Sequence, residues 1–476
     1  MDADADVDVV VDANADVVVC LDGRRRRTGT RQRLRQRPGP RTGTRLRPRP
    51  RTGPRPRPRS GIACRLSPVA CRLFLPAFAL LLTLGLTAAC SRNINLLPAL
   101  GDGGAAGTGG GDTNVTPTCT GLGDPITLPT ASGPTCAAAL ASRGHRYVLC
   151  SCESLSAPAR IRSDSFDSRT TPAFTEADAA FGINGDLMST AEVRAGGAFH
   201  VAGAGGLRAQ NHIRSAASLR VGGPLAMLSD NTDVGTDAYV NGDVSGSNGS
   251  VRVNGTLHMP PTATRSGDVQ YGALALEAVS VPAPCDCSAG FADVPAAIAA
   301  AAASNADTMI GLSPSTLATV PSAKELQLPC GTFYLDDINA DAPVTITVRG
   351  RTLLVVAGDV TIRDGFTVAL DPSAELDLLV GGWLTISGGS FGAAAAPSRF
   401  RVWVAGTDSI TFDNAPTVSA VVHAPLAPVS APSGLPLSGS ILARSFAIGS
   451  DSTLHFDRAI LEAGVVCGAP AAVPPP

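Results

Sequence analysis

The chain has 476 residues, a formal charge of −2 and only 4% aromatic residues, against 51 glycines. This composition favours thin stacked coils with small inward side chains over a globule built on large aromatic anchors. The charge is unevenly distributed, because residues 1–22 carry seven Asp and no cation while residues 24–72 carry 18 Arg and no acid. From Cys90 onward acids exceed Lys and Arg by 13, so this part lacks the basic surface that nucleic-acid binding requires.

Residues 1–64 form a low-complexity tract, first Asp/Val-rich and then Arg/Pro-rich. Such a composition buries little apolar surface and predicts disorder. One interpretation is a basic arm that binds nucleic acid or anionic lipid. The favoured interpretation is an upstream extension that is not translated, with synthesis starting near Leu66 or Val69, because a complete export signal follows.

Residues 65–89 are typical of a signal peptide. Arg65 and Arg72 give the positive n-region, and Leu73–Leu86 give the apolar h-region. The following Thr87-Ala-Ala-Cys90 resembles a bacterial lipobox, although such motifs more often have Leu where Thr87 stands. The resemblance implies that Cys90 is lipidated and becomes the mature N-terminus.

A transmembrane anchor is the alternative for this apolar run. The run is short for a span and is interrupted by Pro76, so a lipid anchor is favoured. Ser91 follows the cysteine, where an Asp would indicate retention in the inner membrane. We therefore expect a cell-envelope protein that is lipid-anchored to the outer membrane of a Gram-negative bacterium.

Residues 90–118 are rich in Gly, Ala, Thr and Asn and predict a flexible tether spanning on the order of 30 Å. Eight cysteines follow, and their even number in an exported chain indicates disulfides, up to four of them. A zinc site built from the two Cys-x-Cys pairs is the disfavoured alternative. One arrangement joins the 119–152 cysteines to the 285–330 cysteines, with the last one fixing the C-terminus; the connectivity stays open. The candidates are Cys119, Cys136, Cys150, Cys152, Cys285, Cys287, Cys330 and Cys467.

After a cysteine-containing head at residues 119–176, residues 177–281 repeat short apolar runs that close on glycine. Val251-Arg-Val-Asn-Gly-Thr-Leu257 is an example, and its alternation has the period of a strand with one buried face. Asn-Gly and Gly-Gly suit tight corners. Hairpins of a meander are the alternative, but the runs are short and similar, so stacked parallel coils are predicted.

Residues 282–335 are predicted to be an insert that contains a helix. Asp293–Ser304 has an N-cap residue, Pro295 in its first turn and a run of alanines. This helix is expected to lie on the coils or to close one end, since an uncovered coil end is an open sheet edge. Leu326–Leu335 leads back into a strand.

Residues 336–462 carry the clearest repeat. Three apolar runs end around Gly358, Gly382 and Gly406, which are 24 residues apart, and such a period is typical of a solenoid. The Pro-rich stretch Ala424–Pro436 is predicted to be a loop between coils, and residues 463–476 a C-terminal tail. The fold class predicted is all-β: a right-handed parallel β-helix with a short Ala-rich helical insert and a disulfide-linked N-terminal head.

The Cys-x-Cys head, the serial glycine steps, the Leu-Pro-Cys-Gly step and the terminal His-Phe-Asp-Arg-Ala-Ile together resemble an uncharacterised family of bacterial secreted β-helix lipoproteins. The resemblance covers roughly Tyr147 to Leu461. More distantly the chain is similar to bactofilin-type polymer-forming and surface-adhesin β-helices. The resemblance implies a fold and a location, and no chemistry.

Few motifs in the sequence indicate catalysis or metal binding. His455 and Asp457 share one strand face and could do acid–base work, but a capping hydrogen bond at the end of the last coil is favoured. Ser229–Asp237 has the acid density of a calcium loop without its spacing, so a solvated loop is favoured. No catalytic residue, metal ligand or cofactor is predicted.

The rival function is a polysaccharide-binding or polysaccharide-cleaving β-helix. Asp359, Asp364, Asp371 and Asp377 could line one coil face as the paired carboxylates of a glycosidase. Against this, both tryptophans, Trp383 and Trp403, stand beside valines of core type and are expected to be buried. The favoured prediction is therefore a non-enzymatic structural, adhesive or assembly module, with the membrane as partner through the lipid, and with envelope polysaccharide, a surface protein or self-association as further possibilities.

Overall fold

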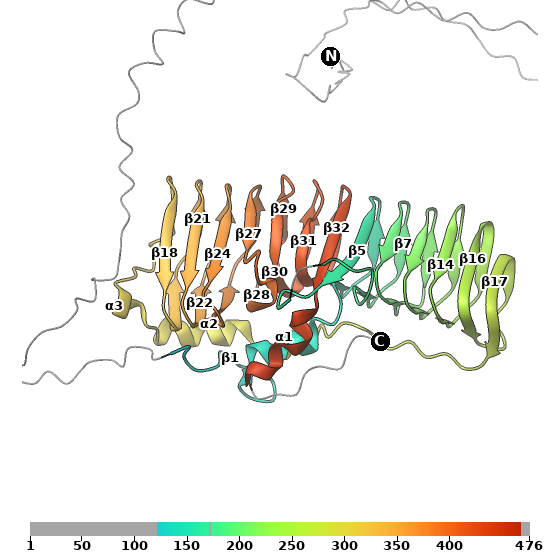
Figure 1. Ribbon diagram of the computed structural model, residues 1–476, viewed down its shortest axis with the longest axis horizontal. Helices are drawn as coiled ribbons and strands as arrows, with labels where there is room; N and C mark the ends of the chain where they lie inside the picture. Colours follow the sequence, from blue (N-terminus) through green and yellow to red (C-terminus); the bar gives the residue numbers. More distant parts are fainter. Residues whose placement is uncertain (1–120, 171–172, 468–476) are drawn as a thin grey trace, which may run out of the picture. The chain divides into compact units, whose positions relative to one another are not determined.

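The structure is a computed structural model that describes residues 121–170 and 173–467. These residues form a parallel β-solenoid of about 14 turns with a few short helices, which confirms the predicted fold class (Figure 1). One 30-stranded sheet contains every described strand except the antiparallel pair β1 (Thr127–Leu128) and β2 (Thr135–Cys136). Cys90 and the predicted signal peptide and tether lie outside the described residues.

Each regular coil has three strands, and each strand pairs in parallel with its equivalent in the next coil. β18 (Lys324–Leu328), β19 (Gly331–Leu335) and β20 (Ile338–Ala340) thus pair with the three strands that follow. The later strands of this second coil set are β21 (Val344–Val348), β22 (Arg351–Val356), β23 (Val360–Ile362), β24 (Phe366–Leu370), β25 (Glu375–Val380), β26 (Leu384–Ser387), β27 (Ser390–Gly392), β28 (Phe400–Val404), β29 (Ile410–Asp413), β30 (Thr417–Ala431), β31 (Leu437–Ile448) and β32 (Ser452–Asp457).

The 24-residue glycine rhythm is the length of each of two successive coils in the middle of this set. Val356 pairs with Val380, and Val380 pairs with Val404, so the three glycines that follow stack at one corner. The proline-rich stretch predicted as a loop is instead strand as far as Ala431, because β30 runs through its prolines with a register shift between Ala424 and Pro428.

The first coil set has shorter coils, as the pairing of Leu187 with Leu207 and of Leu207 with Leu225 shows. All its strand pairs are parallel, so the hairpin alternative is wrong. Its strands are β3 (Leu149–Ser151), β4 (Leu155–Ala157), β5 (Ile161–Phe166), β6 (Phe181–Ile183), β7 (Leu187–Ser189), β8 (Val193–Ala195), β9 (Phe199–Val201), β10 (Leu207–Ala209), β11 (Ile213–Ser215), β12 (Leu219–Val221), β13 (Leu225–Met227), β14 (Asn231–Val234), β15 (Ala238–Val240), β16 (Val244–Met259) and β17 (Arg265–Leu276).

Two predicted boundaries differ from the structure. The range 119–176, predicted as a head, contains the complete coil β3–β5, and the range 282–335, predicted as an insert, contains the strands β18 and β19. The return to strand at Leu326–Leu335 was predicted, but the coil formed by β3, β4 and β5 was missed, because its strands are short and stand next to cysteines.

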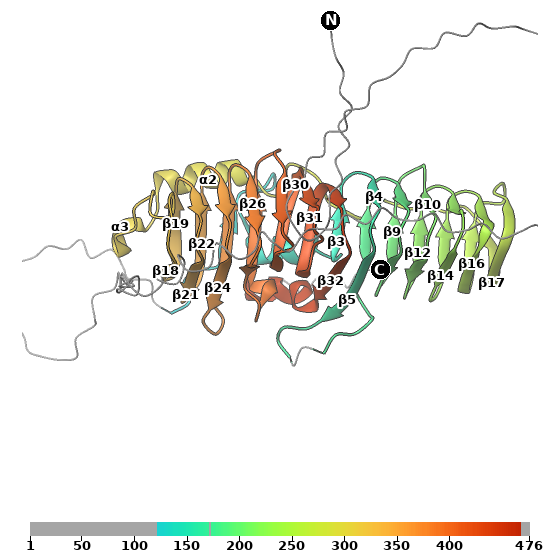
Figure 2. The same ribbon diagram turned by 90° about the horizontal axis from the view of Figure 1, so that it is seen from above.

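The coils do not stack in chain order. Leu149 of β3 pairs with Ile441 of β31, and Ile161 of β5 pairs with Ser452 of β32, so the first coil of the first set lies on the last coil of the second set. The chain therefore enters the solenoid in its middle, runs to β17 at one end, returns along the outside and starts again with β18 at the other end (Figures 1 and 2).

Strand alternation builds the core. In β21 the side chains of Val344, Ile346 and Val348 are buried, and the threonines between them are half-buried. Because equivalent positions stack from coil to coil, the inward residues of all coils form one continuous hydrophobic cluster along the axis.

One side of the solenoid is covered, and we call it the covered face: β19, β22, β25, β28 and the middle of β30 and β31, continued by β3, β6, β9, β12 and β15. The helices α1 (Ala137–Gly144), α2 (Val294–Ala303) and η2 (Arg458–Cys467) lie along this side (Figure 1). Asp293 accepts a hydrogen bond from the backbone of Ala296 at 3.0 Å, which confirms the predicted helix and its N-cap. No described helix is long and apolar enough to span a membrane.

Candidate functional site

Two disulfides fix the return segment, residues 277–293, to β3 and the residue after it, in the middle of the solenoid. Cys150 bonds to Cys285 and Cys152 to Cys287, each across 135 residues. The zinc alternative for these four thiols is therefore wrong, and the predicted link between the head and the insert is confirmed for them. A third disulfide, between Cys136 and Cys467, ties α1 to the C-terminal η2, as predicted for the last cysteine.

Cys330 is disulfide-bonded as well. Cys119 lies outside the described residues. Since three disulfides converge where the two coil sets meet, the covalent links stabilise the junction that pairing of β3 with β31 creates.

Two histidines are buried at this junction. His145, just after α1, and His423, on β30, have ring centroids 5.5 Å apart, and the Trp403 and Phe291 rings lie beside His423. The His145 Nδ1 lies 3.0 Å from the Ser440 hydroxyl. Burial lowers the pKa of His423 to about 4, and burial together with the neighbouring His423 holds the pKa of His145 well below its usual value.

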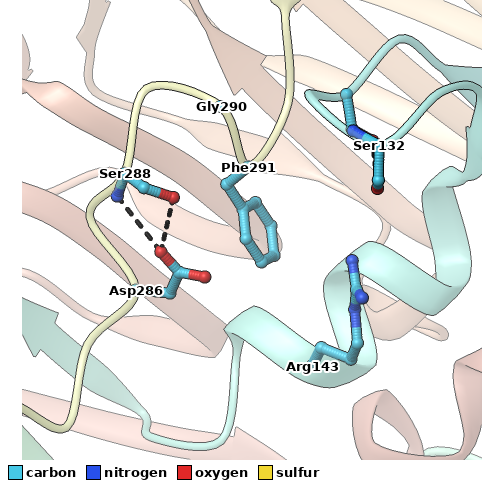
Figure 3. A pocket seen from close by; sticks show the side chains of 7 residues that line it. Ser132, Arg143, Asp286, Ser288, Gly290 and Phe291 are labelled. Carbon is cyan, nitrogen blue, oxygen red and sulfur yellow. Dashed lines mark hydrogen bonds between the residues drawn. The ribbon is translucent and has the colours of Figure 1, made fainter.

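A small cavity of about 250 Å³ lies beside this cluster (Figure 3). Phe291 stands between Asp286 and Ser288 of the return segment on one side and Arg143 and Ser132 on the other. The Asp286 carboxylate already accepts hydrogen bonds from the backbone and hydroxyl of Ser288, at 3.1 and 2.7 Å. The lining can offer a cation, an anion and hydroxyl groups to a small polar molecule.

The four aspartates considered for a catalytic face do not meet on one surface. Asp377 is completely buried on β25 and binds the guanidinium of Arg401 through both carboxylate oxygens, at 2.6 and 2.8 Å. Glu375 binds the same guanidinium at 2.6 Å. Asp364 and Asp371 are exposed in turns. The pKa of Arg401 is raised, because its two carboxylate partners outweigh the opposing effect of burial.

Asp359 has a structural role that recurs along the solenoid. Its carboxylate accepts the backbone N–H of Trp383 in the next coil at 3.1 Å, as Asp337 accepts that of Asp359 at 2.8 Å. Each carboxylate reaches across the corner glycine of the next coil: a Cβ at Gly358 would lie 2.1 Å from Asp337, and a Cβ at Gly382 would lie 2.0 Å from Asp359. The glycine rhythm thus leaves room for a carboxylate that satisfies a corner N–H.

The two tryptophans differ. Trp403 is fully buried, as predicted, and its indole donates to Asp377 at 2.7 Å. The prediction of burial is wrong for Trp383, which is 45% exposed. Trp383 follows a corner glycine, where the side chain points out of the coil although valines stand nearby in sequence.

His455 and Asp457, both in the last coil, contact different partners. His455 is half-buried and its Nδ1 lies 2.5 Å from a carboxylate oxygen of Asp164. Asp457 is completely buried and accepts the backbone N–H groups of Ser168 and Ser398 at 3.0 and 3.1 Å. The two side chains therefore serve separate contacts, and the favoured prediction of a capping role holds for Asp457.

Another group of titratable side chains lines a hollow of about 420 Å³ that we call the groove. Its lining comes from three successive coils, from residues directly before β8, β11 and β14 and from residues within β8 and β14. His212 lies between two carboxylates, with Nε2 2.7 Å from Asp233 and Nδ1 3.6 Å from Glu192. The lining residues are Glu192, Arg194, Asn211, His212, Asp230, Asn231 and Asp233.

Arginines balance the acids of the groove. Arg162, Arg194 and Arg214 occupy one ladder position in three paired strands. Burial alone would raise the pKa of Glu192, but the hydrogen bond from Arg162 and the charge of Arg194 outweigh it, so this pKa is lowered. A lowered pKa keeps Glu192 ionised, which suits ion pairing rather than the role of a general acid.

Within this region the sequence singles out only Ser229–Asp237, which has calcium-like acid density and was predicted to be a solvated loop. In the structure this stretch contains β14, Asp233 contacts His212, and Asp237 accepts the backbone N–H of Thr256 at 2.7 Å. The groove was missed because its residues are about 20 apart in sequence. A polar residue directly before each strand, as in Glu192-Val193 and His212-Ile213, is the signal that could have found it.

Residues 291–463 match a family model described as "Domain of unknown function (DUF7305)". The match runs from Phe291 at the end of the return segment through α2 and the second coil set into η2, so this part of the chain is similar to that family. No curated protein matches the chain, and no solved structure matches it.

Proposed function

We propose that the chain is a non-enzymatic, lipid-anchored module of the cell envelope with a structural, adhesive or assembly role. The observation that carries this proposal is the long parallel solenoid, in which acidic side chains such as Asp337, Asp359 and Asp377 are engaged in corner hydrogen bonds and ion pairs. Disulfides at the junction support an oxidising compartment outside the cytoplasm, in agreement with the predicted export signal.

Lipidation at Cys90 is the first test. Labelled fatty acid should enter the full chain and should not enter Cys90→Ala, because the lipidated sulfur is then missing. Cys71→Ala is the matched control, since it removes another cysteine of the same N-terminal region and should keep the label. Equal labelling of wild type and Cys90→Ala would contradict the anchor.

A second candidate function is polysaccharide binding in the groove, and the geometry around His212 favours it. Carboxylates, an imidazole and the guanidinium of Arg194 face one hollow that crosses three coils, so a chain of sugars could contact equivalent positions about 4.8 Å apart. Purified protein should be offered cell-wall and exopolysaccharides, with binding and released products measured separately. Release of products that His212→Ala abolishes would overturn the non-enzymatic proposal.

A further inference from the structure

The two ends of the solenoid differ. At the β18 end, α3 (Asp307–Ile310) and residues 311–320 lie over the first coil. Their apolar side chains join the core cluster: Ile310, Leu312, Leu317 and Val320. At the opposite end β17 pairs with β16 and with no other described strand (Figure 1).

The uncovered end exposes the last layer of the core. The register places Tyr271 on Val253 and Leu276 on Met259, which are inward residues of β16. Val253 and Met259 are 3% and 0% exposed, whereas Tyr271 and Leu276 are 36% and 54% exposed. The free backbone groups of β17 lie in the same layer, so this end combines an apolar centre with an unpaired strand edge.

Arg265 partly covers this end. Its register partner is the buried Val244, so it occupies an inward position. Its guanidinium lies 5.4 Å from the centre of the Tyr271 ring and donates to the Tyr271 hydroxyl. An inward-pointing charge on an edge strand discourages pairing with arbitrary strands. Arg265 leaves Leu276 uncovered, however, so a partner of matching shape and charge can still dock.

We propose that the β17 edge docks onto the β17 edge of a second copy, which gives a two-fold dimer with antiparallel end strands. Continued parallel stacking would need the β18 end of the second copy, and α3 covers that end. A closed dimer is therefore favoured over an open filament. This proposal deepens the assembly role proposed above and rests on it, while the lipid anchor is tested separately and can fail alone.

The two-fold axis is expected to pass through Gln270. This placement sets inward residues opposite inward ones, with Val269 of one copy facing Tyr271 of the other, and it sets Gln270 opposite itself. The symmetry also exchanges the start and the end of β17. Arg265 of each copy then lies beside the stretch of the other that ends in Glu277, so opposite charges meet.

The end face is small. Its sides are only three to four residues long, at about 3.3 Å per residue, so the face is far smaller than the about 800 Å² per partner of a standard interface. We therefore expect a weak dimer that forms at micromolar or higher concentration.

Disulfide trapping tests the geometry directly. Gln270→Cys should give a covalent dimer under mild oxidation of the full chain, because opposed residues of antiparallel strands lie within disulfide range. Gln327→Cys on β18 is the matched control at the covered end and should crosslink no more than wild type. Crosslinking of Gln270→Cys at or below that of Gln327→Cys would overturn the proposal.

Association should also be measured by analytical ultracentrifugation. Tyr271→Lys places like charges on both sides of the axis, so it should raise the dissociation constant of the wild-type dimer at least tenfold. Circular dichroism should show that this variant keeps its strands. A wild type that stays monomeric at hundreds of micromolar, or that forms open filaments, would also overturn the proposal.

Discussion

At the scale of single residues, carboxylates hold this structure together in two ways. Half-buried ones at the coil corners, such as Asp359, accept a backbone N–H of the next coil, and the buried Asp377 forms an ion pair with Arg401 beneath the covering elements. A buried ion pair is weak evidence of net stabilisation, but removing one partner leaves an uncompensated charge. The buried and exposed aspartates should therefore respond very differently to substitution.

Asp377→Ala should lower the free energy of unfolding by about 3–5 kcal/mol, because Arg401 then keeps only Glu375 and the Trp403 indole loses its acceptor. Denaturant unfolding followed by circular dichroism measures this loss. Asp364→Ala, at an exposed turn, is the control and should change stability by less than about 0.5 kcal/mol. Equal effects of the two substitutions would contradict the assigned burial.

The buried histidines predict a pH dependence. The pKa of His423 is about 4 in the folded state and lies below its ordinary value, so between pH 6.5 and 4 the unfolded chain binds more protons. The free energy of unfolding should then fall as the pH falls through this window, by up to roughly 3 kcal/mol for this residue. His145 and His200 have lowered pKa values and act in the same direction.

Hydrogen exchange at pH 7 and pH 4.5 measures this effect locally. Protection in α1 and the return segment should drop at the lower pH more than protection in the core strand β25, because His145 and His423 lie beneath these covering elements. His423→Phe should reduce the difference, since a phenyl ring does not bind a proton. An unchanged pH dependence in His423→Phe would contradict this prediction.

At the scale of elements, the return segment is a short chain without regular structure that two disulfides fix to β3. Loop-closing disulfides of this kind stabilise mainly by restricting the unfolded chain. The segment also contributes Phe291 to the cluster over Trp403 and His423. Its attachment therefore controls how well the covered face is shielded.

The double substitution Cys285→Ser with Cys287→Ser should cost about 2–5 kcal/mol for each lost disulfide and make the return segment sensitive to protease. Limited proteolysis with mass spectrometry locates the first cuts, which should fall within residues 277–293. Ser288→Ala is the control in the same segment and should leave the protease resistance unchanged. Cuts that start within the coils would contradict the expected order of unfolding.

At the scale of the whole described unit, the order of the coils along the chain differs from their order in space. The two coil sets are joined in the chain by residues 277–323, but in space they meet at β3 and β31. The junction buries core residues of both sets, so it resembles the interior of one solenoid rather than a contact between two domains.

A protease site inserted at the exposed Ser280 tests this order. After cleavage the two coil sets should still elute together under native, oxidising conditions, because strand pairing and the disulfides join them. They should separate only in denaturant with a reductant. Separation under native conditions after the disulfides have been reduced would contradict the observed pairing of β3 with β31, because only strand pairing then joins the two coil sets.

The sequence by itself determined the solenoid, the 24-residue coil length in the second set, the Asp293-capped helix and the presence of disulfides. These are local or periodic properties. Inward valines recur because each coil faces the same core, and corner glycines recur because each coil turns at the same place. The same reasoning correctly predicted that Trp403 is buried. It failed for Trp383, which is exposed because it follows the corner glycine Gly382 and points out of the coil.

The tertiary structure alone decided which coil lies on which, which cysteines bond and which polar residues meet. The pairing of Ile441 with Leu149 bridges almost 300 residues, and no sequence period reports it. The groove around His212 likewise gathers residues one coil apart, from stretches that look unrelated in the chain. Periodicity records the distance of each residue from the axis, whereas the order of the coils and the chemistry of each face depend on contacts between distant segments.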